Sequence, residues 1–288
     1  MSADAFPWMK HLTVKQVREY LQKRQSLIVP IGSIEQHGYH LPLVTDTLVA
    51  EQISGRVGSR TGTLVAPVVS FTFSGGGLPG TINVSPAVMS LLVQDVLASL
   101  ALQGFRQFYL VLAHGGSENL TALGDALKIL LRANPLFERG LVCLFPVWKF
   151  DAKGTGWRKA FAEGDWHAGW LETSLMLALA PELVRMGELE LDPPPLLDLQ
   201  IAHPDNYQHA EKIVDDPLAV PRLSQRPDIR VGVMGYPKRA SRELGERIAE
   251  DMVEQMAARL QSIQERSQGG YREVAFTPPP IIIREEDT

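Results

Sequence analysis

Short segments of this sequence combine carboxylate and imidazole side chains at spacings that suit metal ligation. In the first, Glu35 and His37 directly follow the apolar run 27–31 and lie two residues apart. Side chains two residues apart on an extended chain point to the same side, so these two form a ligand pair. Asp46 follows a short loop that contains glycine and proline. Its carboxylate can therefore return to the same point and bridge two cations.

The second segment begins where another apolar run, 108–113, ends. His114 is followed there by Gly115 and Gly116. Glycines at a strand end let the backbone turn sharply and approach a ligand closely. Glu118 comes shortly afterwards and has two readings: a second metal ligand, or an acid in the first turn of a helix, where the helix dipole favours negative charge.

In the third segment, His167 and Glu172 flank the expected start of a helix that extends to about residue 180. Both side chains could therefore face one cleft as ligands or as acid and base groups. Carboxylate oxygen together with imidazole nitrogen suits Zn(II), Mn(II) or Fe(II), whereas Mg(II) and Ca(II) favour shells made only of oxygen. The three segments together predict a transition-metal site.

Two further features are candidates for contact with a substrate. Trp166 is either part of an aromatic wall against a flat substrate or a residue of the core. Ser74, Gly75 and Gly76 either cradle an anionic group through backbone amides or form a flexible turn.

The elements that must position these residues alternate between strands and helices. Continuous apolar runs predict buried strands at 27–31, 64–69, 108–113 and 141–147. Helical spacing of apolar residues predicts helices after Thr13 and at 86–103, 120–133, 172–180 and 241–264. Buried strands covered by helices require a mostly parallel α/β sheet, whose strand ends are where ligands usually bind.

Length and composition predict an ordinary globular protein. The chain has 288 residues and a formal net charge of -5, so nothing recommends a nucleic-acid partner. No window approaches the roughly 18 apolar residues of a membrane span, and no basic-then-apolar leader opens the sequence. These features predict a cytoplasmic protein with no membrane partner. The single cysteine, Cys143, excludes a thiolate metal cluster.

Two segments fall outside the alternating pattern. Residues 192–230 are rich in proline and polar residues, which predicts a long loop or a peripheral excursion that could contribute to an oligomer interface. The tail 277–288 is too short to form a domain of its own. We therefore expect one domain across residues 1–288.

Taken together, the motifs resemble those of the creatininase family of creatinine amidohydrolases and their relatives. The matching features, in chain order, are residues 29–46, residues 74–82, His114-Gly-Gly, His167-Ala-Gly with Glu172-Thr-Ser, and residues 233–241. The Glu-x-His element with its following aspartate is specific to that family. The resemblance spans most of the chain up to about residue 260.

The resemblance implies a three-layer α/β/α sandwich with a binuclear metal centre, assembled as a homohexamer. Carried over by position, Glu35 and His114 hold one metal, His37 holds the other, and Asp46 bridges the two. His167 matches the active-site histidine of the family. It would stabilise the tetrahedral oxyanion or deliver a proton to the leaving nitrogen.

The fifth ligand is open between two glutamates. Creatininase has a glutamate two residues after the histidine that matches His114, and this sequence has Gly116 there. Glu118 is displaced by two residues, whereas Glu172 keeps the place that relatives of the His-Gly-Gly type use. We favour Glu172 as the ligand. The glutamate that does not bind metal is a candidate proton shuttle.

The resemblance also implies a reaction. We expect hydrolysis of a C–N bond in a small molecule, a cyclic amide, amide or formamide, by a water activated between two divalent cations, Zn(II) or Mn(II), with Fe(II) as a further option. Gly115 replaces a tyrosine of creatininase, which argues against creatinine itself. The alternatives are deformylation of a formylamino heterocycle and cleavage of a modified peptide. A non-catalytic binding protein is a further rival, but it would have little reason to retain five ligand-type residues.

Overall fold

A four-stranded parallel sheet forms the centre of the molecule in the computed structural model, which describes residues 8–267 and 270–275. Its strands, in the order β2-β1-β3-β4, are β1 (Ser26–Ile31), β2 (Leu64–Val65), β3 (Gln107–Leu112) and β4 (Leu141–Pro146). Ile31 pairs with Leu112, and Leu112 pairs with Pro146. The carboxyl ends of three neighbouring strands therefore lie level at one edge of the sheet.

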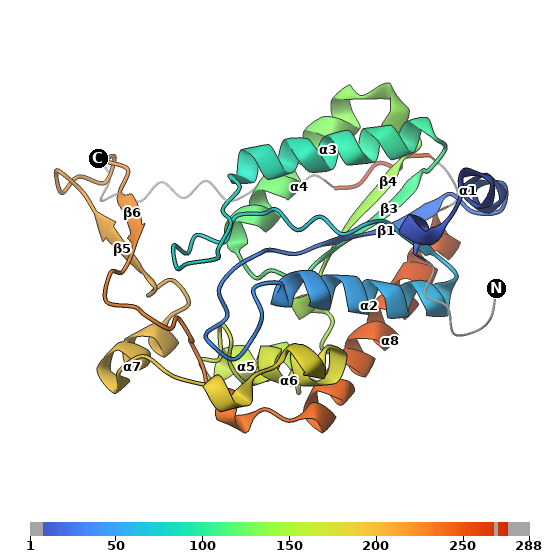
Figure 1. Cartoon of the computed structure of the whole chain (residues 1–288). Coiled ribbons are helices and arrows are strands. Elements are labelled where there is room, and N and C mark those ends of the chain that lie inside the picture. The colour runs from blue at the N-terminus through green and yellow to red at the C-terminus, as the bar shows by residue number, and fades with distance from the viewer. Residues whose placement is uncertain (1–7, 268–269, 276–288) are drawn as a thin grey trace.

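Helices cover both faces of the sheet, and the three-layer α/β/α fold is confirmed (Figure 1). One face carries α3 (Pro86–Leu102) and α4 (Ser117–Ala133). The other carries α2 (Thr45–Thr61), α5 (Trp157–Ala162), α6 (Trp170–Leu179) and α8 (Arg242–Arg266). The short α1 (Val14–Leu21) lies at the end of the sheet nearer the N-terminus. No helix in the described part of the chain is long and apolar enough to span a membrane.

Alternate residues of the strands supply two separate hydrophobic cores. Ile28 and Tyr109 pack in the core beneath α2, α6 and α8, whereas Leu27 and Phe108 pack in the core beneath α3 and α4. Successive side chains of a strand point to opposite faces, so a strand buried on both faces must be apolar throughout. This requirement explains the continuous apolar runs in the sequence. Strands are confirmed at all four predicted places, although β2 covers only Leu64–Val65 of the predicted 64–69.

The predicted helices are confirmed with small shifts at their ends, but α2 was not predicted. Thr13 and Ser241 cap α1 and α8 as their side chains accept backbone N–H groups. Helix α2 contains Gly55 and Gly58 and many β-branched or hydroxyl residues, which are poor helix formers. Burial between the sheet and α8 stabilises it instead, since most helical stability in proteins comes from tertiary packing.

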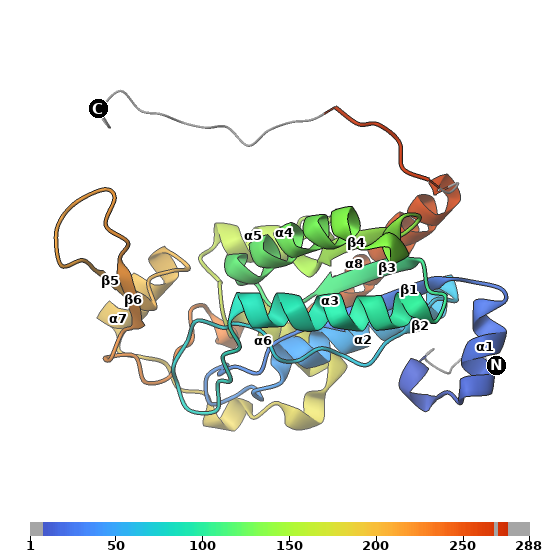
Figure 2. The ribbon, with the colours of Figure 1, turned by 90° about the horizontal axis from the view of Figure 1, so that it is seen from above.

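Residues 192–230 form a peripheral excursion with structure of its own. It consists of α7 (Pro194–Ala202) and an antiparallel hairpin of β5 (Gln208–Glu211) and β6 (Arg222–Gln225). These elements stand at one end of the molecule, apart from the three layers (Figures 1 and 2). The base of the excursion is closed by Asp192, whose carboxylate accepts hydrogen bonds from the N–H groups of Arg230, Val231 and Gly232 at 2.8, 3.1 and 2.9 Å. The tail 277–288 lies outside the described residues.

Short 3-10 helices connect several of these elements. They span Met9–His11, Pro135–Phe137, Val147–Lys149, Pro181–Leu183, Met186–Glu188 and Pro237–Arg239.

Candidate metal centre

The segment after β1 places Glu35 and His37 in the interior at the carboxyl edge of the sheet. Both side chains are buried, and the Nδ1 atom of His37 lies 3.1 Å from the backbone oxygen of Glu35. A carbonyl only accepts, so Nδ1 carries the proton and donates it. This leaves Nε2 to face the cluster, which is how a backbone carbonyl commonly orients a metal-binding histidine.

Asp46 occupies the centre of the cluster from the first turn of α2. Its Oδ1 atom lies 3.4 Å from Nε2 of His37, and its Oδ2 atom lies 3.0 Å from Nδ1 of His114. The hydroxyl of Ser33 donates a hydrogen bond of 2.5 Å to the same Oδ2. One carboxylate thus lies between two imidazoles, each facing a different oxygen, which is the arrangement that a bridging ligand requires.

His114 leaves the end of β3 beside the segment that follows β1. Its Nδ1 atom lies 3.2 Å from Oε1 of Glu35. The potential ligand atoms fall into groups within which all lie less than 4.8 Å from one another: Glu35 with Asp46 and His114, His37 with Asp46 and Glu172, and Glu35 with His37 and His167. The first two groups share Asp46.

The two glutamates that compete for the fifth position lie in different surroundings. Glu172, in the first turn of α6, is buried with its Oε2 atom 3.7 Å from Nε2 of His37. The same oxygen accepts a 2.6 Å hydrogen bond from the N–H of Ala168. Glu118, in the first turn of α4, is exposed and belongs to none of the ligand groups found among the described residues. The structure therefore brings Glu172 into the cluster and leaves Glu118 at its approach.

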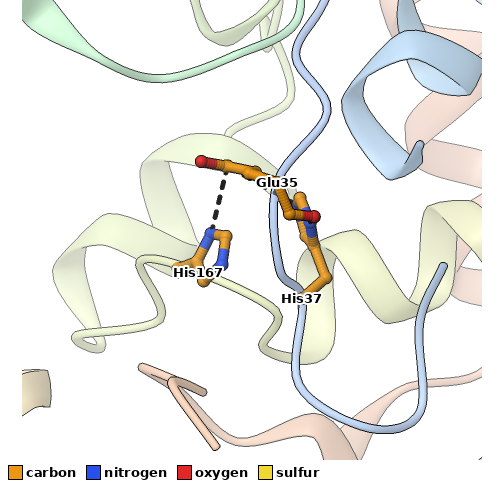
Figure 3. Close-up of side chains that lie close together, drawn as sticks. All are labelled: Glu35, His37 and His167. Atoms are coloured by element: carbon orange, nitrogen blue, oxygen red, sulfur yellow. Dashed lines mark hydrogen bonds and ion pairs between the residues drawn. The ribbon is translucent and has the colours of Figure 1, made fainter. Parts of the chain in front are cut away.

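His167 approaches the cluster from the segment that precedes α6. Its Nδ1 atom lies 3.6 Å from Oε1 of Glu35, as the dashed line in Figure 3 marks. Its Nε2 atom lies 2.7 Å from the backbone oxygen of Gln36, and it must donate a proton to that carbonyl. The side-chain nitrogen of Gln36, 3.0 Å away, donates to the Gly232 carbonyl instead. In neutral His167 the lone pair therefore lies on Nδ1 and faces the cluster.

A second buried carboxylate fixes the turn between His167 and Glu172. Asp165 accepts hydrogen bonds from the N–H groups of Trp170, Leu171 and Tyr236 at 3.0, 3.1 and 2.8 Å. Ala168, inside this turn, has a φ of 52°, a left-handed conformation that residues other than glycine rarely adopt. The local strain is held in place by these contacts, which is common where a functional site fixes its geometry.

Burial and close charges shift the pKa values of the clustered groups in opposite directions. Burial would lower the pKa of His37, but the carboxylates of Asp46, Glu172 and Glu35 outweigh it and raise this pKa to about 10. Burial raises the pKa of Glu172 to about 7, against the opposing charge of His37. Burial and the charge of His37 lower the pKa of His167 to about 4. Without metal, the site thus holds protons on His37 and leaves His167 neutral.

The chemistry of this donor set fits divalent cations. Three carboxylates are buried together, and charges of one sign are costly to bury unless they are paired or bind metal. The Nε2 atom of His37, which faces Asp46 and Glu172, is buried without a hydrogen-bond partner. Buried polar atoms are nearly always satisfied in native proteins, so such an orphaned nitrogen indicates a missing ligand.

Comparison with known proteins agrees with this geometry. The family model described as creatininase, creatinine amidohydrolase, matches residues 10–260. The chain belongs to the creatininase family. It is 32% identical to the creatinine amidohydrolase of Pseudomonas putida over 247 residues, which cover 80% of this chain and 86% of the relative. It is 30% identical to the mycofactocin precursor peptide peptidase of Mycolicibacterium smegmatis over 251 residues, covering 83% and 85% of the two chains.

Solved structures of creatininases have the same fold. A zinc-zinc form of a mutant creatininase superimposes with a TM-score of 0.70 at 27% identity and covers 92% of this chain and 99% of its own. A manganese form has a TM-score of 0.69 at 27% identity and covers 92% and 100%. The protein is thus a hydrolase of the creatininase family, and the creatinine amidohydrolase and the peptide peptidase both act on C–N bonds.

A cavity of about 460 Å³ opens above the ligand cluster of this creatininase-family protein. Trp157, Phe161 and Trp166 line one wall, and the rings of Phe161 and Trp166 are stacked with centroids 5.4 Å apart. The nitrogen of the Trp166 ring donates to the backbone oxygen of Ile201 at 2.9 Å, so α7 fixes its orientation. Of the two positions that the sequence left open for Trp166, the structure places its side chain at the wall of the cavity.

The glycine-rich turn also borders this cavity, through Ser74 and Gly76. Its amides, however, already have partners within the chain. The N–H groups of Ser74 and Gly75 donate to Oδ1 of Asn83 at 3.0 and 2.9 Å, and the N–H of Gly76 lies 3.3 Å from Oγ of Ser74. The structure therefore favours the turn over the anion cradle, since the hydrogen bonds that would hold an anion are used to shape the loop.

Several residues that shape the site were missed in the sequence. Ser33 orients Asp46, Gln36 orients His167, and Asp165 fixes the turn before α6. Ser33 and Gln36 act through partners 13 and 131 positions away. Asp165 acts through backbone N–H groups, which carry no residue type. Only the position of Ser33, between a buried strand and the first predicted ligand, indicates that it lies near the site.

Proposed function

We propose that this protein is a metal-dependent amidohydrolase that cleaves a C–N bond of a small cyclic amide, amide or formamide with a water activated between two divalent cations. The observation that carries the proposal is the pair of ligand groups that share Asp46. Two three-residue groups joined through one carboxylate match the ligand set of a binuclear hydrolase.

In this proposal Glu35, His114 and Asp46 hold one cation, and His37, Asp46 and Glu172 hold the other. Mixed nitrogen and oxygen donors favour Zn(II) or Mn(II), with Fe(II) also compatible. The zinc and manganese forms of the related creatininases support this choice. Because His37 donates through Nδ1 to a carbonyl, its Nε2 is the atom that would bind metal.

Two divalent cations would supply a water of lowered pKa and polarise the scissile carbonyl. His167 supplies the proton transfer. Its Nδ1 lone pair faces the cluster and accepts a proton there, while its Nε2–H remains bonded to Gln36. The protonated ring then donates from Nδ1 to the leaving nitrogen. Stabilisation of the oxyanion by His167 requires the same Nδ1–H, so both roles expected from the sequence belong to its protonated state. Glu118, at the mouth of the cavity, is the remaining candidate for moving protons to solvent.

The substrate is a small molecule that fits a cavity of about 460 Å³ with an aromatic wall. Deformylation and peptide cleavage are the alternatives within the enzyme class. The similarity to a mycofactocin precursor peptide peptidase supports a peptide substrate, because that relative covers 83% of this chain. A non-catalytic binding protein has no need for buried nitrogens aimed at a carboxylate cluster.

The decisive experiment is metal analysis of purified protein combined with a screen of cyclic amides, formamides and short peptides. We expect close to two metal equivalents per chain and hydrolysis of at least one class, which chelation abolishes. Full activity in metal-free protein would exclude the two-metal mechanism. Tight metal binding without hydrolysis of any class would favour the binding protein.

We also propose a cytoplasmic homohexamer. Large apolar side chains of the excursion, Ile213, Leu218 and Val220, are almost fully exposed in the single chain, which supports burial in an assembly. Light scattering at micromolar concentration tests the assembly, and a monomer would contradict it.

A further inference from the structure

The excursion shapes the outer half of the cavity above the metal cluster. We call this half the outer cleft. It is lined by Glu118 at the start of α4 and by His203, Asp205, Tyr207 and Gln225 of the excursion. Gln225 ties the hairpin to the glycine-rich turn by accepting a hydrogen bond from the N–H of Gly77. The excursion therefore forms one wall of the outer cleft and is hydrogen-bonded to the loop opposite.

Among the residues that the structure describes, the charged side chains lining the cavity include carboxylates but neither lysine nor arginine. The carboxylates of the outer cleft are Glu118 and Asp205. Arg226, next to Gln225, pairs with Asp228 at 3.0 Å and does not line the cavity. His203 also lines the outer cleft, and its Nδ1 lies 3.2 Å from the backbone nitrogen of Asp205 and 3.8 Å from Oδ2 of the same residue. The outer cleft therefore carries net negative charge.

Tyr207 lines the outer cleft, and the pKa of its hydroxyl is shifted by the same carboxylates. Burial raises the pKa of its hydroxyl, and the carboxylates of Glu118, Asp205 and Glu35 raise it further. No cation opposes them among the causes of this shift. Negative charges from α4 and the excursion therefore converge on Tyr207.

The inner end of the cavity offers complementary surfaces. Phe161 stacks on Trp166, and Trp157 lies 5.7 Å from Phe161 between ring centroids. Faces of such rings attract cations. At the base, His114 and Glu35 line the cavity and belong to the ligand cluster, with Nδ1 of His114 lying 3.2 Å from Oε1 of Glu35. Bound cations there would be largely balanced by the carboxylates of Glu35, Asp46 and Glu172, so they would not cancel the charge of the outer cleft.

We infer that the outer cleft binds a positively charged group of the substrate, an ammonium, amidinium or guanidinium, while the scissile amide lies at the metal cluster. A carboxylate in the same place would be repelled. This inference rests on the proposed function for the position of the amide, but the charge preference of the cleft is measurable by binding alone.

The test compares two probes of nearly equal shape, benzylammonium and benzyl alcohol, titrated into manganese-loaded protein at pH 7. Neither contains an amide, so binding is separated from hydrolysis. We expect benzylammonium to bind roughly fivefold more tightly, as two carboxylates several ångströms away in a partly hydrated cleft would produce, and this ratio to shrink in high salt.

Variants assign the preference to the outer cleft. Asp205→Asn and Glu118→Gln should each reduce the ratio, and the double variant should bring it close to one. Glu254→Gln is the matched control, because Glu254 is an exposed acid of α8 that does not line the cavity. It should keep the ratio of the unmodified protein. Circular dichroism confirms that each variant is folded, and the single variants keep the test decisive should the double variant unfold.

Equal affinity for the two probes in the unmodified protein would overturn the inference, as would a preference that survives in the double variant. A different outcome would refute the proposed function. Absence of amide hydrolysis together with a retained benzylammonium preference would refute the amidohydrolase proposal and leave the charge preference standing. Hydrolysis with no preference between the probes would do the reverse.

Discussion

Replacement of Glu172 by glutamine should remove one of two bound metals. In the second ligand group, Glu172 stands with His37 and Asp46, and Asp46 is shared with the first group. Without a carboxylate at position 172, that cation retains one imidazole and half of a bridging carboxylate. A neutral amide is a much poorer ligand, so the affinity of this site should fall by more than about 100-fold, the upper range for loss of mere supporting contacts.

The substitution is otherwise conservative. The amide oxygen of a glutamine can still accept the 2.6 Å hydrogen bond from the N–H of Ala168. The turn before α6 therefore keeps this hydrogen bond. Glu118→Gln is the matched control, because Glu118 also starts a helix and borders the cavity but belongs to none of the ligand groups among the described residues. It should bind metal in the same stoichiometry as the unmodified protein.

The assay is elemental analysis after dialysis against about micromolar Zn(II) or Mn(II), with calorimetric titration for the affinities. We expect close to two equivalents in Glu118→Gln and close to one in Glu172→Gln. The opposite pattern would assign the fifth ligand to Glu118 and refute the reasoning from geometry. Loss of both metals in Glu172→Gln would show that the two ligand groups do not fill independently.

Other consequences of the site can be measured in the same preparations. Chelation should abolish hydrolysis, and Zn(II) or Mn(II) should restore it; activity that persists in metal-free protein would contradict this. Metal uptake at pH 7 should release about two to three protons. The carboxylates raise the pKa of His37 to about 10 and that of His114 well above its usual value, and burial raises the pKa of Glu172 to about 7, so all three ligands lose protons when they bind metal. Calorimetry in two buffers of different ionisation enthalpy measures the number, and uptake without proton release would refute it. Ser33→Ala should weaken metal binding by roughly 10-fold, since Ser33 orients Asp46; an unchanged affinity would show that α2 alone fixes that carboxylate.

The sequence predicts the sheet because burial on both faces forces each strand to be apolar throughout. Leu27–Ile31 and Phe108–Leu112 are examples, and the level ends of β1 and β3 then bring Glu35 near His114. Ligands that follow directly after strands are therefore within reach of sequence analysis. Asp46 differs, because it follows no strand directly. Motif spacing predicted it as a ligand, but the helix that carries it, α2, was not predicted because its stability comes from packing.

What the sequence leaves open is the choice between equivalent positions in different helices. Glu118 and Glu172 are both acids in the first turn of a helix, and only the arrangement of α4 and α6 distinguishes their burial. The carboxylates of Asp165 and Asp192 are invisible for a related reason. They bind backbone N–H groups of residues up to 71 positions away, and backbone groups carry no residue type.

Because Asp192 closes the base of the excursion, the lining of the outer cleft and the geometry of the ligand cluster can change independently. A single carboxylate joins the chain where it leaves and where it returns, so the 37 residues between Asp192 and Arg230 form a closed segment. Insertions or replacements in that segment would alter the outer cleft without moving His37, Asp46 or the other ligands, which belong to the layers beneath. Changes in this segment could thus alter which substrate is bound, while the reaction at the ligand cluster stays the same.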